Sequence, residues 1–218
     1  MIKAIILLLF LGSGMAGLIY QVLWTKLLSL TFGVTIMAVS AVLTSFFGGL
    51  ALGSYLGGRW IDKYEDGLKW YGLAEILIGL YALSFSWLLI LNNSAYVLIA
   101  QHLAMDFYGL SILKFILSAI LLAIPTTLMG ATLPILSKIL ATSQTRFAKN
   151  IGGLYAINTI GAVIGAIATA FFLIPNIGMK TLLYSVGALN IVIGGIAVFI
   201  SKSYSKGNET NRGYIYEE

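Results

Sequence analysis

Six stretches of this chain are long and apolar enough to cross a lipid bilayer, and together they occupy most of its 218 residues. A hydrocarbon core of about 30 Å needs about 20 helical residues. The predicted spans cover about 3–24, 34–57, 69–91, 111–138, 151–173 and 180–200. Because 59% of the residues are hydrophobic and only 10% are charged, the chain lacks the polar surface of a water-soluble protein. We therefore expect an all-α membrane protein with six transmembrane helices.

The rest of the chain is divided into short polar segments. Residues 1–200 form the predicted transmembrane domain, and the polar, Gly- and Asn-rich residues 201–218 are predicted to be a disordered tail. The connection at about 92–109 has only a short apolar run, interrupted by Gln101, His102 and Asp106. This pattern indicates an interfacial helix on the outer leaflet. The alternative is a seventh, poorly inserted span, which would reverse the orientation of everything after it.

The basic residues gather at one end of the predicted bundle. Lys26 and Lys180 fall in loops at the opposite end, and Lys114 lies near the outer end of the fourth span. Basic residues mark the cytoplasmic side of a membrane protein, so we expect both termini in the cytoplasm and the chain in the inner (plasma) membrane. The net charge of +5 then reports orientation and not nucleic-acid binding. The residues at the basic end are Lys3, Arg59, Lys63, Lys69, Lys138, Arg146, Lys149, Lys202, Lys206 and Arg212.

Few residues in this sequence are suited to catalysis. The chain has no cysteine, which excludes disulfides and thiolate metal sites, and its one histidine, His102, falls in the outer connection. No Ser/His/Asp set, His-Glu-x-x-His motif or carboxylate pair converges within the spans. We expect neither an intramembrane enzyme nor a metal or other cofactor.

Small residues recur at helical spacing within the spans. Gly49, Gly53 and Gly57 form a double GxxxG pattern, and Gly161 and Gly165 form another. Such stripes let helix backbones approach closely in lipid, where no hydrophobic effect drives helices together. Four spans carry one polar side chain on such a stripe, which predicts a partly polar bundle interior and candidate binding groups for a substrate or ion at Gln21, Glu75, Asn158 and Asn190.

Glu75 is the only acidic residue inside a predicted span. Carboxylates within a membrane are costly and are functional candidates by default, here as a site for a cation or a transported proton. The alternative is a protonated or amide-bonded carboxyl that only helps the helices pack. Asn158 enters from the same side to a similar depth, so we expect the two side chains to be able to hydrogen-bond.

The fourth span contains Pro125 and Pro134 in the string IPTTLMGATLP. A proline inside a helix removes a backbone hydrogen bond, and neighbouring groups must satisfy the freed carbonyl. We expect the hydroxyls of Thr126, Thr127 and Thr132 to do so. The two prolines indicate either a bent structural helix or a hinge in a discontinuous helix that lines a cavity.

The loop after the second span contains Gly58, Arg59, Asp62 and Lys63 at the spacing G-x-x-x-D-[RK]. It resembles the opening of the signature loop between the second and third helices of major facilitator transporters. That resemblance implies an acidic and a basic residue that latch the cytoplasmic helix ends in one gating state. The later Gly and Arg of the family pattern are missing here. The alternative is an ordinary charged turn.

Longer strings resemble a second, more specific family. SGMAGLIYQVLWTKLLSLTFG, AEILIGLYAL, IPTTLMGATLPILS and LYAINTIGAVIGAIATAFFLIP are similar to the membrane region of integral-membrane spermidine synthase-like proteins, over about 13–195. The resemblance implies a transporter-like part that other members fuse to an aminopropyltransferase. The Gly-rich nucleotide-binding unit of that enzyme is absent from this sequence, so aminopropyl transfer is not expected of this polypeptide.

Two functions follow from these patterns. The first is a transporter built on half of a major facilitator fold, which pairs with itself as a dimer or with another half and moves a small cationic or polar solute such as a polyamine. The second is a membrane scaffold for a separately encoded soluble aminopropyltransferase or methyltransferase. The first interpretation uses Glu75 as a counter-charge, and the second uses the basic cytoplasmic face as a docking surface.

Overall fold

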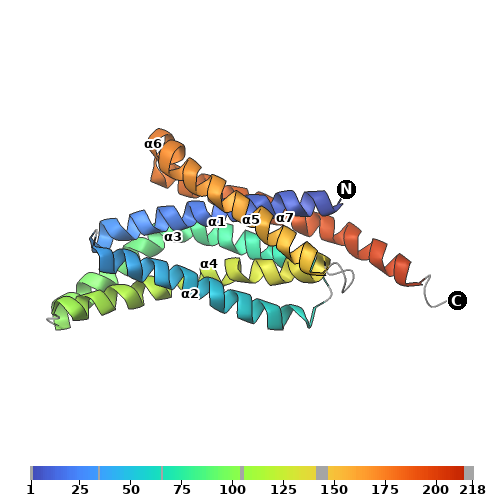
Figure 1. Ribbon diagram of the computed structural model, residues 1–218. Coiled ribbons are helices and arrows are strands. Elements are labelled where there is room, and N and C mark those ends of the chain that lie inside the picture. The colour runs from blue at the N-terminus through green and yellow to red at the C-terminus, as the bar shows by residue number, and fades with distance from the viewer. Residues whose placement is uncertain (1, 34, 65, 104–105, 141–146, 214–218) are drawn as a thin grey trace.

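The computed structural model describes residues 2–33, 35–64, 66–103, 106–140 and 147–213, and within these ranges it contains helices and no strand (Figure 1). A π-helical segment and the short helix α6 continue helix α5, so these three elements act as one span. The helices are α1 (Ile2–Phe32), α2 (Ile36–Ile61), α3 (Gly67–Leu103), α4 (Phe107–Leu140), α5 (Phe147–Ala168), η2 (Thr169–Leu173), α6 (Ile174–Ile177) and α7 (Met179–Gly213).

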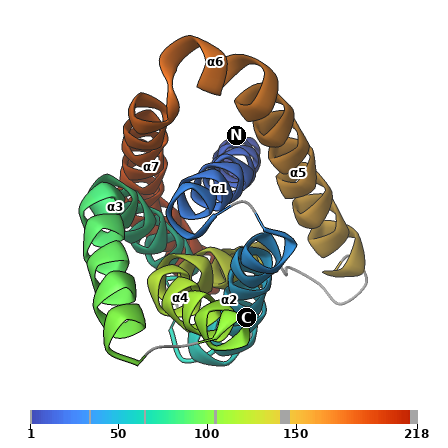
Figure 2. The same ribbon diagram turned by 90° about the vertical axis from the view of Figure 1, so that its left-hand side faces the viewer.

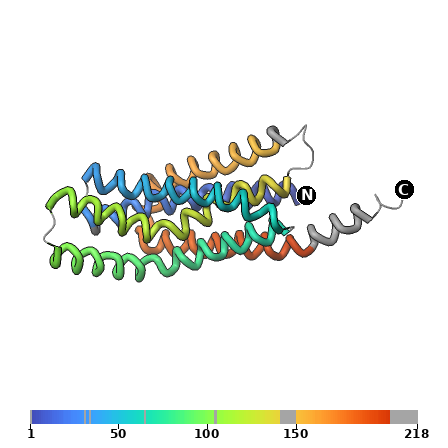
Figure 3. The backbone as a smooth tube through the Cα atoms, turned by 90° about the horizontal axis from the view of Figure 1, so that it is seen from below, coloured from blue at the N-terminus to red at the C-terminus, as the bar shows by residue number. Residues whose placement is uncertain are grey.

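In the described residues, six helical segments are long and apolar enough to cross a membrane, which confirms the expected all-α, six-helix membrane protein. The spans are longer than predicted, and Lys26 and Lys180 lie within helices instead of loops. The beginning of α1 and the end of α7 lie toward one end of the bundle, and the end of α3 and the beginning of α4 lie at the other (Figures 1 and 3). In the end-on view, α1 lies between α5 and α7 (Figure 2).

The outer connection differs from its prediction. Residues 92–103 continue α3, and α4 begins at Phe107, so no separate interfacial helix occurs in the described part of this segment. The amide of Asn92 is buried and donates to the Leu117 carbonyl of α4 at 3.0 Å. The polar Asn92 thus bonds α4 through its amide N–H, while its side-chain oxygen is buried without a hydrogen-bond partner among the described residues.

The C-terminal segment also differs from its prediction. The polar residues 201–213 extend α7 instead of forming a disordered tail, and residues 214–218 lie outside the described part of the chain. Lengthening an existing helix carries no nucleation cost, and α7 contains no proline to stop it. Composition alone therefore underestimates the helix.

Glycine contacts join α2 to α4. A methyl group on Gly53 would collide with the backbone carbonyl of Thr127, and one on Gly57 would lie 2.6 Å from the Ala131 side chain. In return, a methyl group on Gly130 of α4 would collide with the Leu50 carbonyl. These contacts confirm that the stripe on the second span brings backbones together.

An equivalent set of glycine contacts joins α1 to α5. Gly161 and Gly165 of α5 meet the backbones of Leu11 and Met15 in α1. Gly14 of α1 in turn meets the backbone of Asn158 in α5. Gly161 and Gly165 on α5 have the same spacing as Gly53 and Gly57 on α2, and each helix pair has one glycine contact in the reverse direction.

The third pair, α3 with α7, is symmetric within itself. Gly72 lies against the Gly194 carbonyl and Gly79 against the Gly187 carbonyl, and each partner glycine makes the reverse contact. The strings that carry these glycines also match: GLAEILIG in residues 72–79 and GALNIVIG in residues 187–194. The two helices therefore cross at equivalent points.

These contacts divide the bundle into two related repeats, α1–α3 and α4–α7. The packing of α2 on α4 corresponds to that of α5 on α1, and the α3–α7 pair joins the repeats at their centre. Each repeat crosses the membrane three times, so the second has the inverted orientation. Inverted repeats related by a pseudo-two-fold axis in the membrane plane are typical of secondary transporters.

The glycine contacts predict a large difference between two substitutions on α2. Gly53→Ala is expected to destabilise the protein by about 1–3 kcal/mol, because the added methyl group has no space against α4. Gly48→Ala is the matched control, since a methyl group there would meet nothing within 4 Å. Thermal unfolding in mild detergent measures both, and equal stability of the two variants would contradict this packing.

Candidate functional site

Glu75 is fully buried between α1, α3 and α7. Its carboxylate accepts hydrogen bonds at 2.5 Å from the Ser13 hydroxyl of α1 and at 2.5 Å from the Asn190 amide of α7. No described lysine or arginine bonds it. The site is therefore an acidic group held by neutral donors from two other helices.

Glu75 and Asn190 occupy equivalent places in the two repeats, in the strings GLAEILIG and GALNIVIG. The bond between them therefore lies where the pseudo-two-fold axis passes. Glu75 comes eight residues after the beginning of α3 and Asn190 eleven after the beginning of α7. These helices begin at opposite ends of the bundle, so the bond lies about 12 Å from one end and about 16 Å from the other, near the middle of a bilayer.

Two tyrosines lie near the carboxylate. The Tyr20 hydroxyl donates to the Asn190 carbonyl oxygen at 3.1 Å, and the buried Tyr71 hydroxyl lies near Glu75 without forming a hydrogen bond. The Trp24 ring stacks between Tyr20 at 5.0 Å and Phe85 at 5.1 Å. The polar centre thus borders an aromatic cluster formed by α1 and α3.

Two predicted site residues lie apart from this centre. Asn158 packs against Gly14 at the α1–α5 contact, and Gln21 is half-buried on α1. Neither side chain forms a hydrogen bond in the described structure. The expected bond between Asn158 and Glu75 is wrong, because α5 packs on α1 and Asn190 of α7 takes that place.

The predicted gating loop caps helix α2. Gly58 and Arg59 form its last turn, where the Arg59 guanidinium donates to the Tyr55 hydroxyl and lies 5.2 Å from that ring. Asp62 is the C-terminal cap residue, and the exposed Lys63 lies in the turn that follows. None of these charged side chains forms an ion pair among the described residues.

Two lysines of α4 hold the ends of neighbouring helices. Lys138 donates to the Ile61 carbonyl at 2.6 Å and to the Tyr64 carbonyl at 3.0 Å, at the end of α2. Lys114 donates to the Phe32 carbonyl at 2.6 Å, at the end of α1. Cations stabilise the unpaired carbonyls at helix C-termini. The hydrogen bonds that connect the predicted gating loop to α4 therefore come from Lys138.

Pro125 and Pro134 lie inside α4, which remains one helix. Pro125 frees the Leu121 carbonyl, and the Tyr81 hydroxyl of α3 donates to that oxygen at 2.5 Å. Thr126 and Thr132 bond other carbonyls, those of Leu122 and Met129, so the expected role of the threonines at Pro125 is wrong. A hinge at these prolines stays a prediction.

Comparisons of the chain with protein-family models, with curated proteins and with solved structures give no match.

Sequence reasoning missed Ser13, Tyr20 and Tyr71, and it missed the pairing of Glu75 with Asn190. The sequence contains no separate signal for Ser13, because a single serine between glycines is typical of a small packing residue. The pairing did leave a signal, since the two strings with glycines seven residues apart place Glu75 and Asn190 at the same register. Such a repeat within one chain would have placed the two side chains together.

Removing the Asn190 amide is expected to destabilise the protein. Asn190→Leu leaves one carboxylate oxygen of Glu75 without its donor in a buried site, at a cost of about 1–3 kcal/mol. Asn93→Leu on the exposed side of α3 is the control and should change stability little. If both variants unfolded at the same temperature as the unchanged protein, the bond between Asn190 and Glu75 would not contribute to stability.

The Tyr81 bond should matter only while Pro125 is present. Tyr81→Phe is expected to cost about 1–3 kcal/mol, because it leaves the Leu121 carbonyl unpaired. In a Pro125→Ala background the restored N–H at position 125 can bond that carbonyl, so Tyr81→Phe should then cost much less. A double-mutant cycle followed by unfolding measures this coupling, and additive effects would rule it out.

Proposed function

We propose that this chain is half of a transporter for a small cationic or polar solute of the polyamine type, with Glu75 as the counter-charge in the binding site. The observation that carries the proposal is the fully buried Glu75 carboxylate, which has hydrogen-bond donors and no basic partner among the described residues. Ionisable groups inside membrane bundles are costly, and they are functional-site candidates for this reason.

The repeat architecture supports transport. In inverted-repeat transporters the substrate and coupling-ion sites lie near the bilayer midplane at the interface between repeats. Glu75 and Asn190 occupy the corresponding place here. Because Glu75 is enclosed in this structure, a solute can reach it only when α1, α3 and α7 move apart, as alternating access requires.

The side chains around Glu75 support a cationic solute. Tyr20 and Tyr71 are buried near the carboxylate, and the Tyr20 ring stacks on Trp24 in the aromatic cluster. Ammonium groups bind favourably over aromatic faces and next to carboxylates. A primary or secondary amine would find both kinds of partner in this region.

The family resemblance supports a half-transporter that works in pairs. Six helices correspond to half of a major facilitator fold, and in such folds substrates bind between two halves. Gln21 and Asn158 have side-chain amides without hydrogen bonds in the described structure. A second copy or a partner half could satisfy them, since lipid offers no hydrogen-bond partner. We assign the chain to the plasma membrane with both termini in the cytoplasm, on the basis of its basic end.

Flux through proteoliposomes tests this function. The protein is reconstituted with radiolabelled putrescine or spermidine, and uptake above that of empty vesicles is the expected result. Glu75→Gln should reduce uptake at least tenfold, because the amide keeps the shape but loses the counter-charge. Asp106→Asn, which also converts a carboxylate to an amide, at the exposed residue that precedes α4, should leave uptake unchanged.

Orientation is read in the same vesicles and in cells. The chain has no cysteine, so a single cysteine at Lys180 should react with an impermeant thiol reagent from outside the cell, and one at Lys3 should not. Absence of uptake for polyamines, amino acids and other small cations by folded protein would contradict the transport proposal. Co-purification of a soluble transferase under those conditions would favour the scaffold function.

A further inference from the structure

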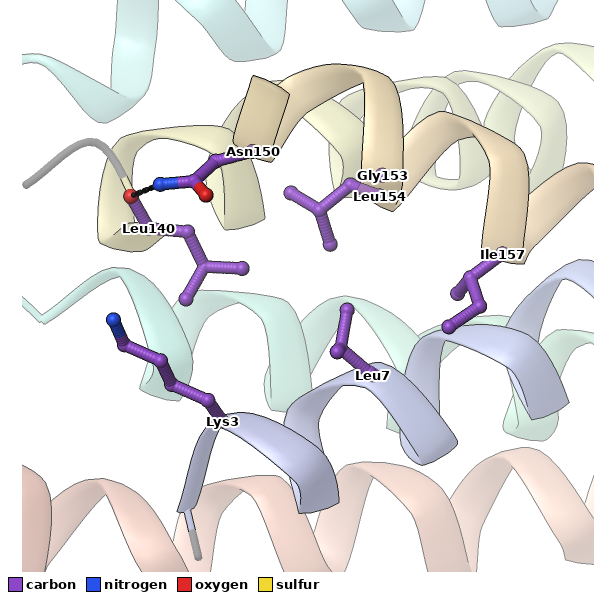
Figure 4. Close-up of a pocket in the computed structure, with 7 residues that line it drawn as sticks. All are labelled: Lys3, Leu7, Leu140, Asn150, Gly153, Leu154 and Ile157. Atoms are coloured by element: carbon purple, nitrogen blue, oxygen red, sulfur yellow. Dashed lines mark hydrogen bonds between the residues drawn. The ribbon is translucent and has the colours of Figure 1, made fainter. Parts of the chain in front are cut away.

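A groove lies between α1, α5 and the end of α4, on the side of the bundle where the chain termini lie (Figure 4). Its volume is about 260 Å³. Asn150 lies toward one end of the groove and Ile157 toward the other (Figure 4), and they are seven residues apart on α5, so the groove runs about 10 Å along the helix. Its lining residues are Lys3, Leu7, Leu140, Asn150, Gly153, Leu154 and Ile157.

The mouth of the groove carries a positive charge at Lys3. The Lys3 side chain is exposed and forms no ion pair or hydrogen bond with a described residue. α1 and α5 run parallel and begin at this end, so the positive ends of two helix dipoles point the same way (Figure 1). The Asn150 side-chain amide is fixed because its N–H donates to the Leu140 carbonyl at 2.9 Å. Its side-chain oxygen forms no hydrogen bond with Lys3 in the described structure.

Below the mouth the groove is apolar. Leu7 of α1 and Leu154 and Ile157 of α5 form its walls (Figure 4). At Gly153 a methyl group would meet nothing within 4 Å, so the glycine keeps the space between the helices open. A polar head at the mouth and an apolar chain below it would match this division.

The fold does not require this groove. In the other repeat, the positions equivalent to Leu140, Asn150 and Leu154 are Trp24, Val42 and Phe46. These three side chains are buried, and the Trp24 and Phe46 rings pack at 6.4 Å. The same space is thus filled at one end of the bundle and open at the other.

We propose that the groove binds one anionic phospholipid, with the phosphate at Lys3 and an acyl chain along Leu7, Leu154 and Ile157. The groove begins at the ends of the spanning helices, at the depth of the headgroups, and descends into the hydrocarbon region. Basic pockets between transmembrane helices on the cytoplasmic side are suited to anionic headgroups. The occupant is distinct from any solute at Glu75, which lies deeper in the bundle.

Native mass spectrometry of the protein in mild detergent tests the site. Phosphatidylglycerol and phosphatidylcholine with identical acyl chains are titrated separately, and one phosphatidylglycerol should be retained at least several-fold more tightly than phosphatidylcholine. Lys3→Gln should weaken phosphatidylglycerol binding about fivefold, the equivalent of about 1 kcal/mol for one basic residue at a membrane surface. Lys26→Gln, at the opposite end, should leave it unchanged.

Two further arms separate the possible sources of binding. Gly153→Leu, which fills the open space, should abolish retention of the bound lipid while unfolding stability shows that the protein remains folded. Inorganic phosphate at millimolar concentration should not displace the lipid, whereas a site for free phosphate would be competed. Equal retention of both lipids, or unchanged phosphatidylglycerol binding in both Lys3→Gln and Gly153→Leu, would overturn the proposal.

Discussion

Close contact between helix backbones at glycine is the interaction on which this bundle depends. Lipid tails are as apolar as leucine, so burial of apolar side chains contributes little free energy to the association of transmembrane helices. The three principal pairs instead meet where Gly53 faces Thr127, Gly161 faces Leu11 and Gly72 faces Gly194. These contacts bring helix axes close enough for dispersion forces to act along their length, and they leave no freedom in register. The polar centre is positioned as a result.

Glu75 shows how the repeat relation and the chemistry are connected. Two related helices cross at equivalent points, and the same register carries a carboxylate on one and an amide on the other. Two carboxylates at this contact would repel each other, and two amides would provide no charge. The pair that occurs provides one acid and its own donor. Ser13 adds a second donor from α1, so the repeats are equivalent in backbone but not in side chains.

Much of the fold could be read from the sequence, because the bilayer fixes span length and the glycine spacing fixes contact faces. The GxxxG patterns at Gly53 and at Gly161 identified helix faces that do pack. Partner identity could not be read in the same way. Asn158 and Asn190 both lie on small-residue stripes, and only the spatial order of α5 and α7 decides that Asn190 reaches Glu75. Helix ends were also poorly predicted, since the Asn92 amide N–H donates to a carbonyl of another helix, a partner that no local pattern reveals.

The two lysines of α4 limit how this bundle can rearrange. Each ammonium is fixed on the terminal carbonyls of a different neighbour, α1 at one end and α2 at the other. Sliding α4 by one turn, about 5.4 Å, would break the hydrogen bonds of both lysines and leave the carbonyls of two helix termini without hydrogen-bond donors. Screw-like motion of this helix is therefore disfavoured. We expect α1, α2 and α4 to tilt together as one body that includes α5, whose glycines pack on α1, and relative movement is left to α3 and α7.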